Sequence, residues 1–382
     1  MPLKHFSKSV FASTSFHLIH PQVPTESTGN SARRGRLALL LSSALLFAIG
    51  TVAGLAQDTS TPPNIDAIVV FGDSLSDTGN VAHETQEEFG FRVPGPIADY
   101  TDGRFTDGKD TLPPAEKYFG VWIEQYAASL PTKPKVKDSL DGGTNFAYGY
   151  ATTEYGLGVF PFGPSNEYSV DVENVSQQIS DYLATRPKIT DETLFVVWGG
   201  ANDVLGATSE DDVIFAAAYE ALDIQTLVDA GATHFLIPNL PPLGAVPRLN
   251  GSPVTSVPAT EASALYNEVL GIAITVIRDI NPGKKLDISE LDVFSLFNEI
   301  IASPSTYSLV NVTKSSQGEP VDPDTYLFWD DLHPTTHGHN ILAKAAAVSV
   351  AARESFEGRV PAGKDLTALK AEIAAELEAR TH

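Results

Sequence analysis

A short apolar run that ends abruptly in small polar residues constrains the fold of this chain most. Residues 65–71 read Ile-Asp-Ala-Ile-Val-Val-Phe, and residues 72–80 read Gly-Asp-Ser-Leu-Ser-Asp-Thr-Gly-Asn. The first part is rich in β-branched residues and does not alternate, which is typical of a strand buried on both faces of a parallel sheet. Ligands bind beyond the carboxyl ends of such strands, so Ser74 is a candidate nucleophile. A helix cap is the alternative interpretation of the same small polar residues.

Further strands and helices alternate along the chain. Strands are predicted within 193–198, 234–239 and 286–294. The spacing of apolar residues predicts helices over 121–128, 172–183, 211–229, 259–280, 296–302 and 338–354. This alternation predicts one α/β domain in which a parallel sheet lies between helical layers.

Two stretches show neither the apolar runs of the buried strands nor the apolar spacing of the helices. Residues 81–120 are rich in Gly, Pro and acidic residues, and they are expected to form a loop with little regular structure. Residues 142–152 alternate between polar and apolar side chains and then become small, which predicts a short strand that enters a tight loop.

Residues 1–56 differ in composition from the rest of the chain. A basic stretch at 33–36 precedes an apolar stretch at 37–50 and a small-x-small end at Ala56. This order predicts a secretory signal cleaved after Ala56, with a long N-terminal leader before it, and therefore a secreted, extracellular protein. A membrane anchor is the alternative, because the apolar stretch is nearly long enough to span a bilayer. The mature domain is expected over 57–382, ending in a helical tail.

Composition excludes several partners and chemistries. The chain has a net charge of −23, and such an acidic surface repels phosphate backbones, which excludes nucleic acid as a partner. It has no cysteine, which excludes disulfides, thiolate catalysis and cysteine-ligated metals. Sequons at Asn174, Asn250 and Asn311 are candidate glycosylation sites and agree with secretion. A monomer without stable membrane association after signal cleavage is expected.

Polar residues beyond the predicted strands provide the candidate chemistry. Asp330 and His333 have a spacing that lets the carboxylate fix the tautomer of the imidazole. The other ring nitrogen can then deprotonate a serine, which is a poor nucleophile without such a base. The Asn202 amide and a backbone N–H of the loop at 149–150 are candidate donors to a developing oxyanion. Taken singly, each of these residues also fits a turn or a cap.

Four motifs in order resemble the GDSL, or SGNH, hydrolase family. They are Gly72-Asp73-Ser74-Leu75, Asn145-Phe146-Ala147-Tyr148-Gly149, Gly200-Ala201-Asn202-Asp203 and Asp330-Asp331-Leu332-His333-Pro334. Gly103-Arg104-Phe105 and residues 239–244 are similar to the subgroup of plant and fungal secreted lipase-acylhydrolases. The resemblance covers residues 65–345. It implies a three-layer α/β/α sandwich with a flavodoxin-like parallel sheet, and cofactor-free hydrolysis of carboxylic esters through an acyl-serine.

The resemblance also assigns roles to residues. By position in the motifs, Ser74 would be the nucleophile, His333 the base and Asp330 the group that orients it. The oxyanion donors would be the Ser74 N–H, a loop N–H and the Asn202 side chain.

The family usually has a second glycine where this chain has Tyr150. Either the Tyr150 N–H or the Gly149 N–H would therefore serve as the loop donor, or the loop is remodelled.

Other functions remain open at this point. Five acidic and histidine residues lie close together and make a metal-dependent hydrolase an alternative: Asp330, Asp331, His333, His337 and His339. A non-catalytic secreted binding protein on the same fold is another. The acidic surface favours neutral substrates, namely acetylated carbohydrates or short-chain acyl esters as small molecules or polysaccharides. A lipase or phospholipase of the same family is the alternative.

Overall fold

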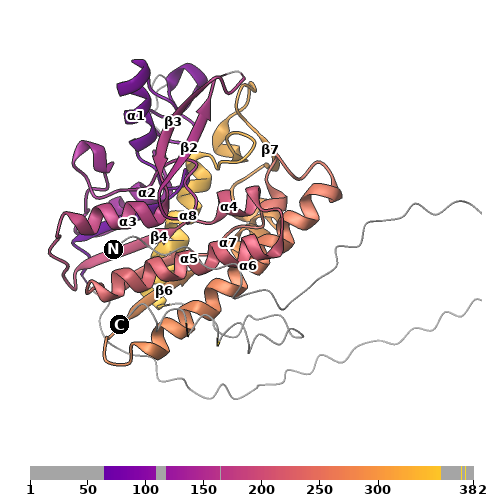
Figure 1. Ribbon diagram of the computed structural model, residues 1–382. Coiled ribbons are helices and arrows are strands. Elements are labelled where there is room, and N and C mark those ends of the chain that lie inside the picture. Colours follow the sequence, from indigo (N-terminus) through magenta and orange to yellow (C-terminus); the bar gives the residue numbers. More distant parts are fainter. Residues whose placement is uncertain (1–63, 109–117, 164, 354–370, 372–374, 376–382) are drawn as a thin grey trace, which may run out of the picture. The chain divides into compact units, whose positions relative to one another are not determined.

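A parallel sheet of four strands lies at the centre of the part of the chain that the structure describes (Figure 1). The structure is a computed structural model, and it describes residues 64–108, 118–163 and 165–353, together with residues 371 and 375. The signal and leader expected at residues 1–56 lie outside the described residues, as does the C-terminal tail apart from those two positions.

The sheet confirms the strands expected from the apolar runs. Its order in space is β1 (Ala67–Gly72), β4 (Thr193–Trp198), β5 (His234–Pro238) and β6 (Asp287–Leu291), and all neighbours are parallel. Every residue of β4 is buried, which explains why the run shows no alternation. Gly72 pairs with Trp198, where an added Cβ would lie only 2.5 Å from the Trp198 carbonyl oxygen, so the strands approach this closely only at a glycine.

Residues 144–148 extend the sheet beyond β1 without forming a full strand. The N–H of Phe146 donates to the carbonyl of Val70 over 2.8 Å, and the N–H of Tyr148 donates to Gly72 over 3.2 Å. This edge segment, followed by β1, β4, β5 and β6, gives the order of a flavodoxin-like doubly wound sheet. The predicted short strand is therefore an extended segment that is hydrogen-bonded to β1 without forming a regular strand of its own.

Helices cover both faces of the sheet (Figure 1). α5 (Glu210–Asp229) packs against α3 (Val175–Ala184) and α6 (Pro253–Ile280) on one face, and α2 (Trp122–Ser129) packs against α8 (Thr336–Ala352) on the other. α4 (Ala201–Gly206) lies between β4 and α5, and α7 (Val293–Ala302) follows β6. The described chain is thus an α/β fold with a parallel sheet between helical layers.

Two local predictions were wrong. Residues 81–120 do not form only a loop, because α1 (Asn80–Phe89) begins there and ends at Gly90 in the left-handed conformation. Few of its residues are buried, so its sequence lacks a long apolar stripe. Residues 172–183 do not form one helix. Val172 belongs to β3 (Tyr168–Glu173), which pairs with β2 (Leu157–Phe162) in an antiparallel hairpin, and α3 begins only after Asn174.

The hairpin stands on a small apolar cluster of its own beside the sheet. The buried members of the cluster are Val81, Phe105, Tyr148, Ala151, Phe162, Val170 and Val172. Because the cluster joins α1, the hairpin and the two loops at 103–105 and 148–151, it fixes these loops at the carboxyl end of β1.

The last two strands form a separate parallel pair. They are β7 (Asn311–Ser315) and β8 (Tyr326–Phe328). Residues 329–335 connect β8 to α8, and this connection carries the Asp-x-x-His motif.

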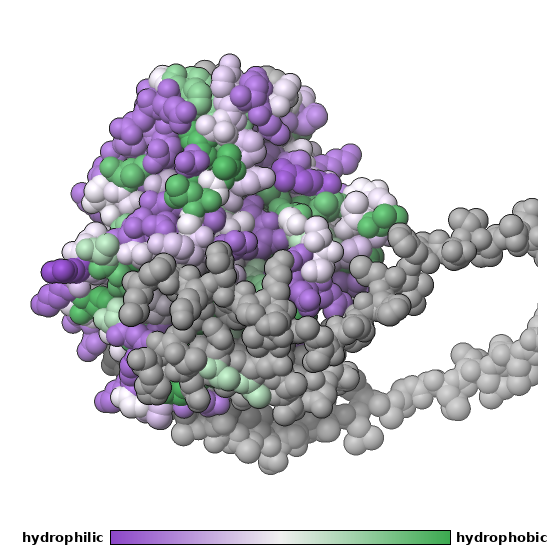
Figure 2. Space-filling model, viewed as in Figure 1, coloured by the Kyte–Doolittle hydropathy of each residue, from purple (hydrophilic) through white to green (hydrophobic). Residues whose placement is uncertain are grey.

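Hydrophilic residues predominate on the face that Figure 2 shows, and apolar residues lie among them in small groups. This distribution agrees with the acidic composition of the chain. Among the described helices, none combines the length and the apolar character needed to cross a bilayer.

Candidate active site

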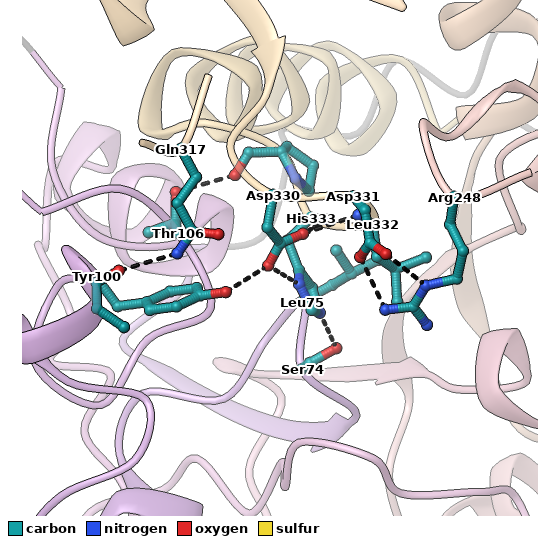
Figure 3. Close-up of polar contacts among 12 residues, drawn as sticks. Ser74, Leu75, Tyr100, Thr106, Arg248, Gln317, Asp330, Asp331, Leu332 and His333 are labelled. Atoms are coloured by element: carbon teal, nitrogen blue, oxygen red, sulfur yellow. Dashed lines mark hydrogen bonds and ion pairs between the residues drawn. The ribbon is translucent and has the colours of Figure 1, made fainter. Parts of the chain in front are cut away.

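The turn after β1 places Ser74 at the carboxyl edge of the sheet. The N–H of Asp77 donates to the carbonyl of Asp73 over 3.0 Å, and this closes the turn around the serine. Ser74 is 7% exposed, and its Oγ lies 2.9 Å from His333 Nε2 (Figure 3). The two side chains, which are far apart in the sequence, therefore meet as the motifs predicted.

The capping function left open for this stretch belongs to Asp77. Its Oδ1 accepts the N–H groups of Gly79 over 2.7 Å and of Asn80 over 2.8 Å, where α1 begins. Its Oδ2 accepts the N–H of Gly149 over 2.9 Å. Burial raises the pKa of Asp77 to about 6, although these N–H groups oppose the rise. Ser74 takes no part in this cap, so its hydroxyl is available for chemistry.

Asp330 holds the imidazole of His333 from the other side (Figure 3). His333 Nδ1 lies 2.7 Å from Asp330 Oδ2, while Asp330 Oδ1 accepts the backbone N–H groups of Leu332 and His333 over 2.8 and 2.6 Å. Burial alone would raise the pKa of the Asp330 carboxyl, but His333 and these two N–H groups hold it well below its usual range. The carboxylate thus stays charged and directs Nε2 towards Ser74.

A segment far upstream supports the histidine turn. The ring of Phe105 packs 5.1 Å from the imidazole of His333 between ring centroids. The Thr106 hydroxyl donates to the carbonyl of Pro334 over 3.0 Å, and the Asp107 carboxylate accepts the first N–H of α8 over 2.5 Å. Three consecutive residues therefore hold the histidine and the chain that follows it.

Asn202 lies in the first turn of α4, directly after β4. Its Nδ2 donates to the carbonyl of Ala151 over 2.9 Å, which uses one of its two hydrogens. Gly200 precedes it with a φ of 90°, and a Cβ there would collide with the ring of Tyr266. Asn202 lines the same cleft as Ser74.

The loop at 149–150 offers one free backbone donor. The Gly149 N–H is already bonded to Asp77, so it is not available to a substrate as long as that bond persists. Tyr150 has a φ of 73°, which is costly for a residue with a side chain, and its N–H has no hydrogen-bond partner among the described residues. Its ring is half-exposed and packs edgewise near Phe160. Of the two donors predicted, Tyr150 is the one that remains free.

Asp203 joins the two loops that carry these donors. Its carboxylate accepts the Thr153 N–H over 3.1 and 3.2 Å and the Thr153 hydroxyl over 3.0 Å. Burial raises the pKa of Asp203 to about 6, against the effect of the Thr153 hydrogen bonds. The bond from Asn202 to Ala151 runs between the same two segments, so Asp203 and Asn202 together fix their separation.

An apolar cleft opens beside Ser74 and His333. Its empty space, open mouth included, is about 490 Å³. Apolar side chains form most of its lining: Leu75, Trp198, Pro241, Leu243, Val246, Phe297, Leu332 and Leu342. Asp73 also lines the cleft, and burial raises the pKa of its carboxyl to about 7. A cleft of this kind accepts an apolar group next to the serine.

Of the five residues considered for a metal, Asp330 and His333 contact each other, Asp331 pairs with Arg248, and the two other histidines have partners elsewhere. The ring of His337 stacks on Tyr118, and its Nδ1 contacts the carbonyl of Asp324 over 2.5 Å. His339 Nδ1 accepts the N–H of Trp122 over 3.2 Å, and burial lowers the pKa of His339 to about 3. The described residues contain no group of three His, Asp or Glu side chains arranged to hold a metal ion.

The three sequons differ in their surroundings. Asn174 is only 6% exposed, and its Oδ1 accepts the N–H of Thr152 over 3.0 Å. This burial disfavours a glycan on Asn174 in the folded protein. Asn250 uses its Nδ2 on two carbonyl groups, over 3.0 and 2.8 Å. Asn311 accepts two backbone N–H groups through Oδ1, over 3.0 and 2.9 Å, and its Nδ2 donates to none of the described residues, so it stays compatible with modification.

Several residues that support the site were assigned no role from the sequence. Phe105 ends the Gly103-Arg104-Phe105 motif, Thr106 and Asp107 directly follow it, and Asp203 follows Asn202 in its own motif. Tyr100 contacts Asp330 but lies in a stretch expected to be an irregular loop. Proximity to a known motif was the only available signal for the first four.

The comparisons with known proteins identify the family. A family profile described as GDSL-like Lipase/Acylhydrolase matches residues 68–346. The chain belongs to this GDSL family, and its enzymes are carboxylic ester hydrolases.

Relatives in other organisms span most of the chain. A phosphatidylcholine-sterol acyltransferase of Aeromonas hydrophila is 26% identical over 359 residues, which cover 81% of this chain and 97% of that protein. An acetylesterase of Thermothelomyces thermophilus is 27% identical over 317 residues, covering 81% and 96%. Among solved structures, the carbohydrate acetylesterase Est24 of Sinorhizobium meliloti is 15% identical, with coverage of 75% and 98% and a TM-score of 0.36.

Proposed function

We propose that the protein hydrolyses carboxylic esters with Ser74 as the nucleophile. His333 Nε2 takes the proton of the hydroxyl as Oγ attacks the ester carbonyl, and Asp330 stabilises the imidazolium that results. The imidazolium then gives the proton to the leaving alcohol, so an acyl-serine remains, and water releases the acid by the same steps. The observation that carries this proposal is the chain of contacts at 2.9 Å from Ser74 to His333 and 2.7 Å from His333 to Asp330.

Three donors are available for the oxyanion of the tetrahedral intermediate. They are the Ser74 N–H, the Tyr150 N–H and the second hydrogen of Asn202 Nδ2, and none of these is used by another described residue. Such donors act where charge develops in the transition state, and each is worth about 3 kcal/mol.

Replacing the nucleophile tests the mechanism. Ser74→Ala is expected to abolish hydrolysis of p-nitrophenyl acetate and labelling by a serine-reactive phosphonate. Ser165→Ala, at an exposed position between β2 and β3, is the matched control and should keep both. A chelator should leave the wild type fully active. Full activity of Ser74→Ala would refute Ser74 as the nucleophile. Inhibition by the chelator with no phosphonate labelling would favour a metal-dependent hydrolase.

We propose acetylated carbohydrates or short-chain acyl esters as substrates. The strongly acidic chain disfavours polyanionic substrates and anionic membranes, and the relative in Thermothelomyces thermophilus is named an acetylesterase. The apolar lining of the cleft favours a second candidate, an esterase or lipase for longer acyl chains, because each methylene buried there contributes about 0.8 kcal/mol.

A chain-length series separates these candidates. We would compare kcat/KM for p-nitrophenyl esters from acetate to laurate with the release of acetate from acetylated xylan. Highest values at two to four carbons support the short-chain proposal. A steady rise to eight carbons or more assigns the protein to the lipase side of the family.

We also propose that the protein is secreted as a monomer after cleavage behind Ala56. The proposal rests on the order of basic, apolar and small residues in 33–56. N-terminal sequencing of protein recovered from the medium should begin at Gln57, and size-exclusion chromatography with light scattering should give the monomer mass. Retention of residues 34–56 in a membrane fraction would favour the anchor instead.

A further inference from the structure

A tyrosine from outside the four motifs contacts the carboxylate that orients His333 (Figure 3). The Tyr100 hydroxyl donates to Asp330 Oδ2 over 2.8 Å, and the same oxygen lies 2.7 Å from His333 Nδ1. The other oxygen accepts two backbone N–H groups. Each oxygen of Asp330 therefore has two donors, so the carboxylate is held in one orientation.

The surroundings of Tyr100 keep its hydroxyl in place as a donor. Its ring lies edge-on to Trp329, with centroids 6.1 Å apart. Gln317 Nε2 donates to the carbonyl of Ala98, two residues before Tyr100, over 2.9 Å. Burial and the adjacent Asp330 raise the pKa of the Tyr100 phenol far above its ordinary value. The phenol is thus protonated throughout any practical assay range.

We propose that Tyr100 is a positioning residue for ester hydrolysis, which acts on the substrate only through Asp330 and His333. This inference rests on the proposed roles of Ser74, His333 and Asp330. A hydroxyl on the oxygen that faces the imidazole has two effects. It fixes that oxygen in line with Nδ1, and it withdraws negative charge from the carboxylate, so the carboxylate attracts the imidazolium less strongly.

The two effects give separate signatures when the hydroxyl is removed. Loss of alignment lowers kcat, because the base is less often directed at Ser74. Loss of the competing donor leaves a carboxylate that attracts the imidazolium more strongly. The acidic limb of the pH–activity profile therefore moves upward. A side chain that only supported packing would lower stability without moving that limb.

Tyr100→Phe is the informative substitution, because it keeps the ring against Trp329 and removes only the oxygen. Tyr126→Phe is the matched control. Tyr126 is a buried tyrosine of α2, and its hydroxyl has no hydrogen-bond partner among the described residues. Ser74→Ala gives the activity without a nucleophile. All three variants and the wild type would be assayed with p-nitrophenyl acetate from pH 4 to 9, and their unfolding midpoints measured.

The other ionisable groups around this pair are the same in all of these proteins. Asp73 lies after β1, His339 lies in α8, and the pair of Asp331 and Arg248 is joined over 2.8 and 3.0 Å at the rim. A difference in the acidic limb between Tyr100→Phe and Tyr126→Phe therefore reports the hydroxyl at position 100.

We expect Tyr100→Phe to lower kcat by about three- to thirtyfold, part of what a charge-assisted hydrogen bond contributes. KM should stay within about twofold and the acidic limb should rise by about half a pH unit. Tyr126→Phe should match the wild type. Unchanged kcat and an unchanged limb in Tyr100→Phe, with Ser74→Ala inactive, overturn the role of Tyr100 alone. So does a lower kcat with an unmoved limb and a lower unfolding midpoint. Activity in Ser74→Ala overturns the proposed function itself.

Discussion

Replacement of Asn202 by alanine should affect catalysis and stability by different amounts. The Nδ2 group has one hydrogen on the Ala151 carbonyl and a second that is free for the oxyanion. Loss of an oxyanion donor costs about 2.7–4 kcal/mol in the transition state, so kcat should fall about a hundred- to thousandfold. Loss of the bond to Ala151 costs the folded state about 1 kcal/mol, because water can reach this half-buried site.

The assay combines steady-state kinetics with urea unfolding. KM should change by less than about threefold, since the carbonyl of the bound ester carries little of the charge that the transition state develops. Asn202→Asp keeps the shape but presents an acceptor to the oxyanion, so its kcat should be at least as low as that of the alanine variant above neutral pH. If Asn202→Ala keeps kcat within about threefold while losing about 1 kcal/mol of stability, Asn202 only braces the loop, and the oxyanion assignment is refuted.

Three further results follow from the same geometry. The unfolding midpoint should show that folding stability decreases from about pH 5 to pH 8. The reason is that burial raises the folded-state pKa of several carboxyls that ionise near pH 4 in the unfolded chain. These carboxyls belong to Asp73, Asp77, Glu173 and Asp203. A flat midpoint over this range contradicts that reasoning. Tyr150→Gly should keep kcat within about threefold, because the proposed donor is the backbone N–H. In urea unfolding, relief of the positive φ should offset most of the entropic cost of glycine. A hundredfold loss of kcat would implicate the ring. Asp330→Asn should lower kcat by about 10⁴-fold with little change in KM, as in other serine hydrolases whose histidine loses its carboxylate. If kinetic assays of this variant gave the kcat of the wild type, Asp330 would be excluded as the orienting group.

The strands and the motif residues could be predicted because their signals are local. A strand buried on both faces must be apolar at consecutive positions, as β4 is, and parallel strands place their carboxyl ends at one edge. The convergence of Ser74 with Asp330 and His333 follows from that rule together with the order of the motifs. In the structure these three side chains lie within hydrogen-bonding distance of one another in a chain of two contacts.

The features that were missed depend on tertiary context. α1 is polar on most of its surface and is held by the carboxylate of Asp77, which no periodicity in its own sequence reveals. Val172 and Val175 have helical spacing, yet a cap residue separates their elements. The occupied N–H of Gly149 and the burial of Asn174 also depend on partners distant in the chain. A single sequence shows residue types and spacing, but it does not show which distant group uses a hydrogen bond.

The contacts of Phe105, Thr106 and Asp107 with the histidine turn have a consequence for engineering. The turn that carries the proposed base has hydrogen bonds of its own, and it is also held by a segment more than two hundred residues earlier in the sequence. Chimeras that exchange the C-terminal region between relatives should therefore transfer residues 100–107 as well. On heating, activity should be lost when residues 100–107 loosen, before the central sheet unfolds.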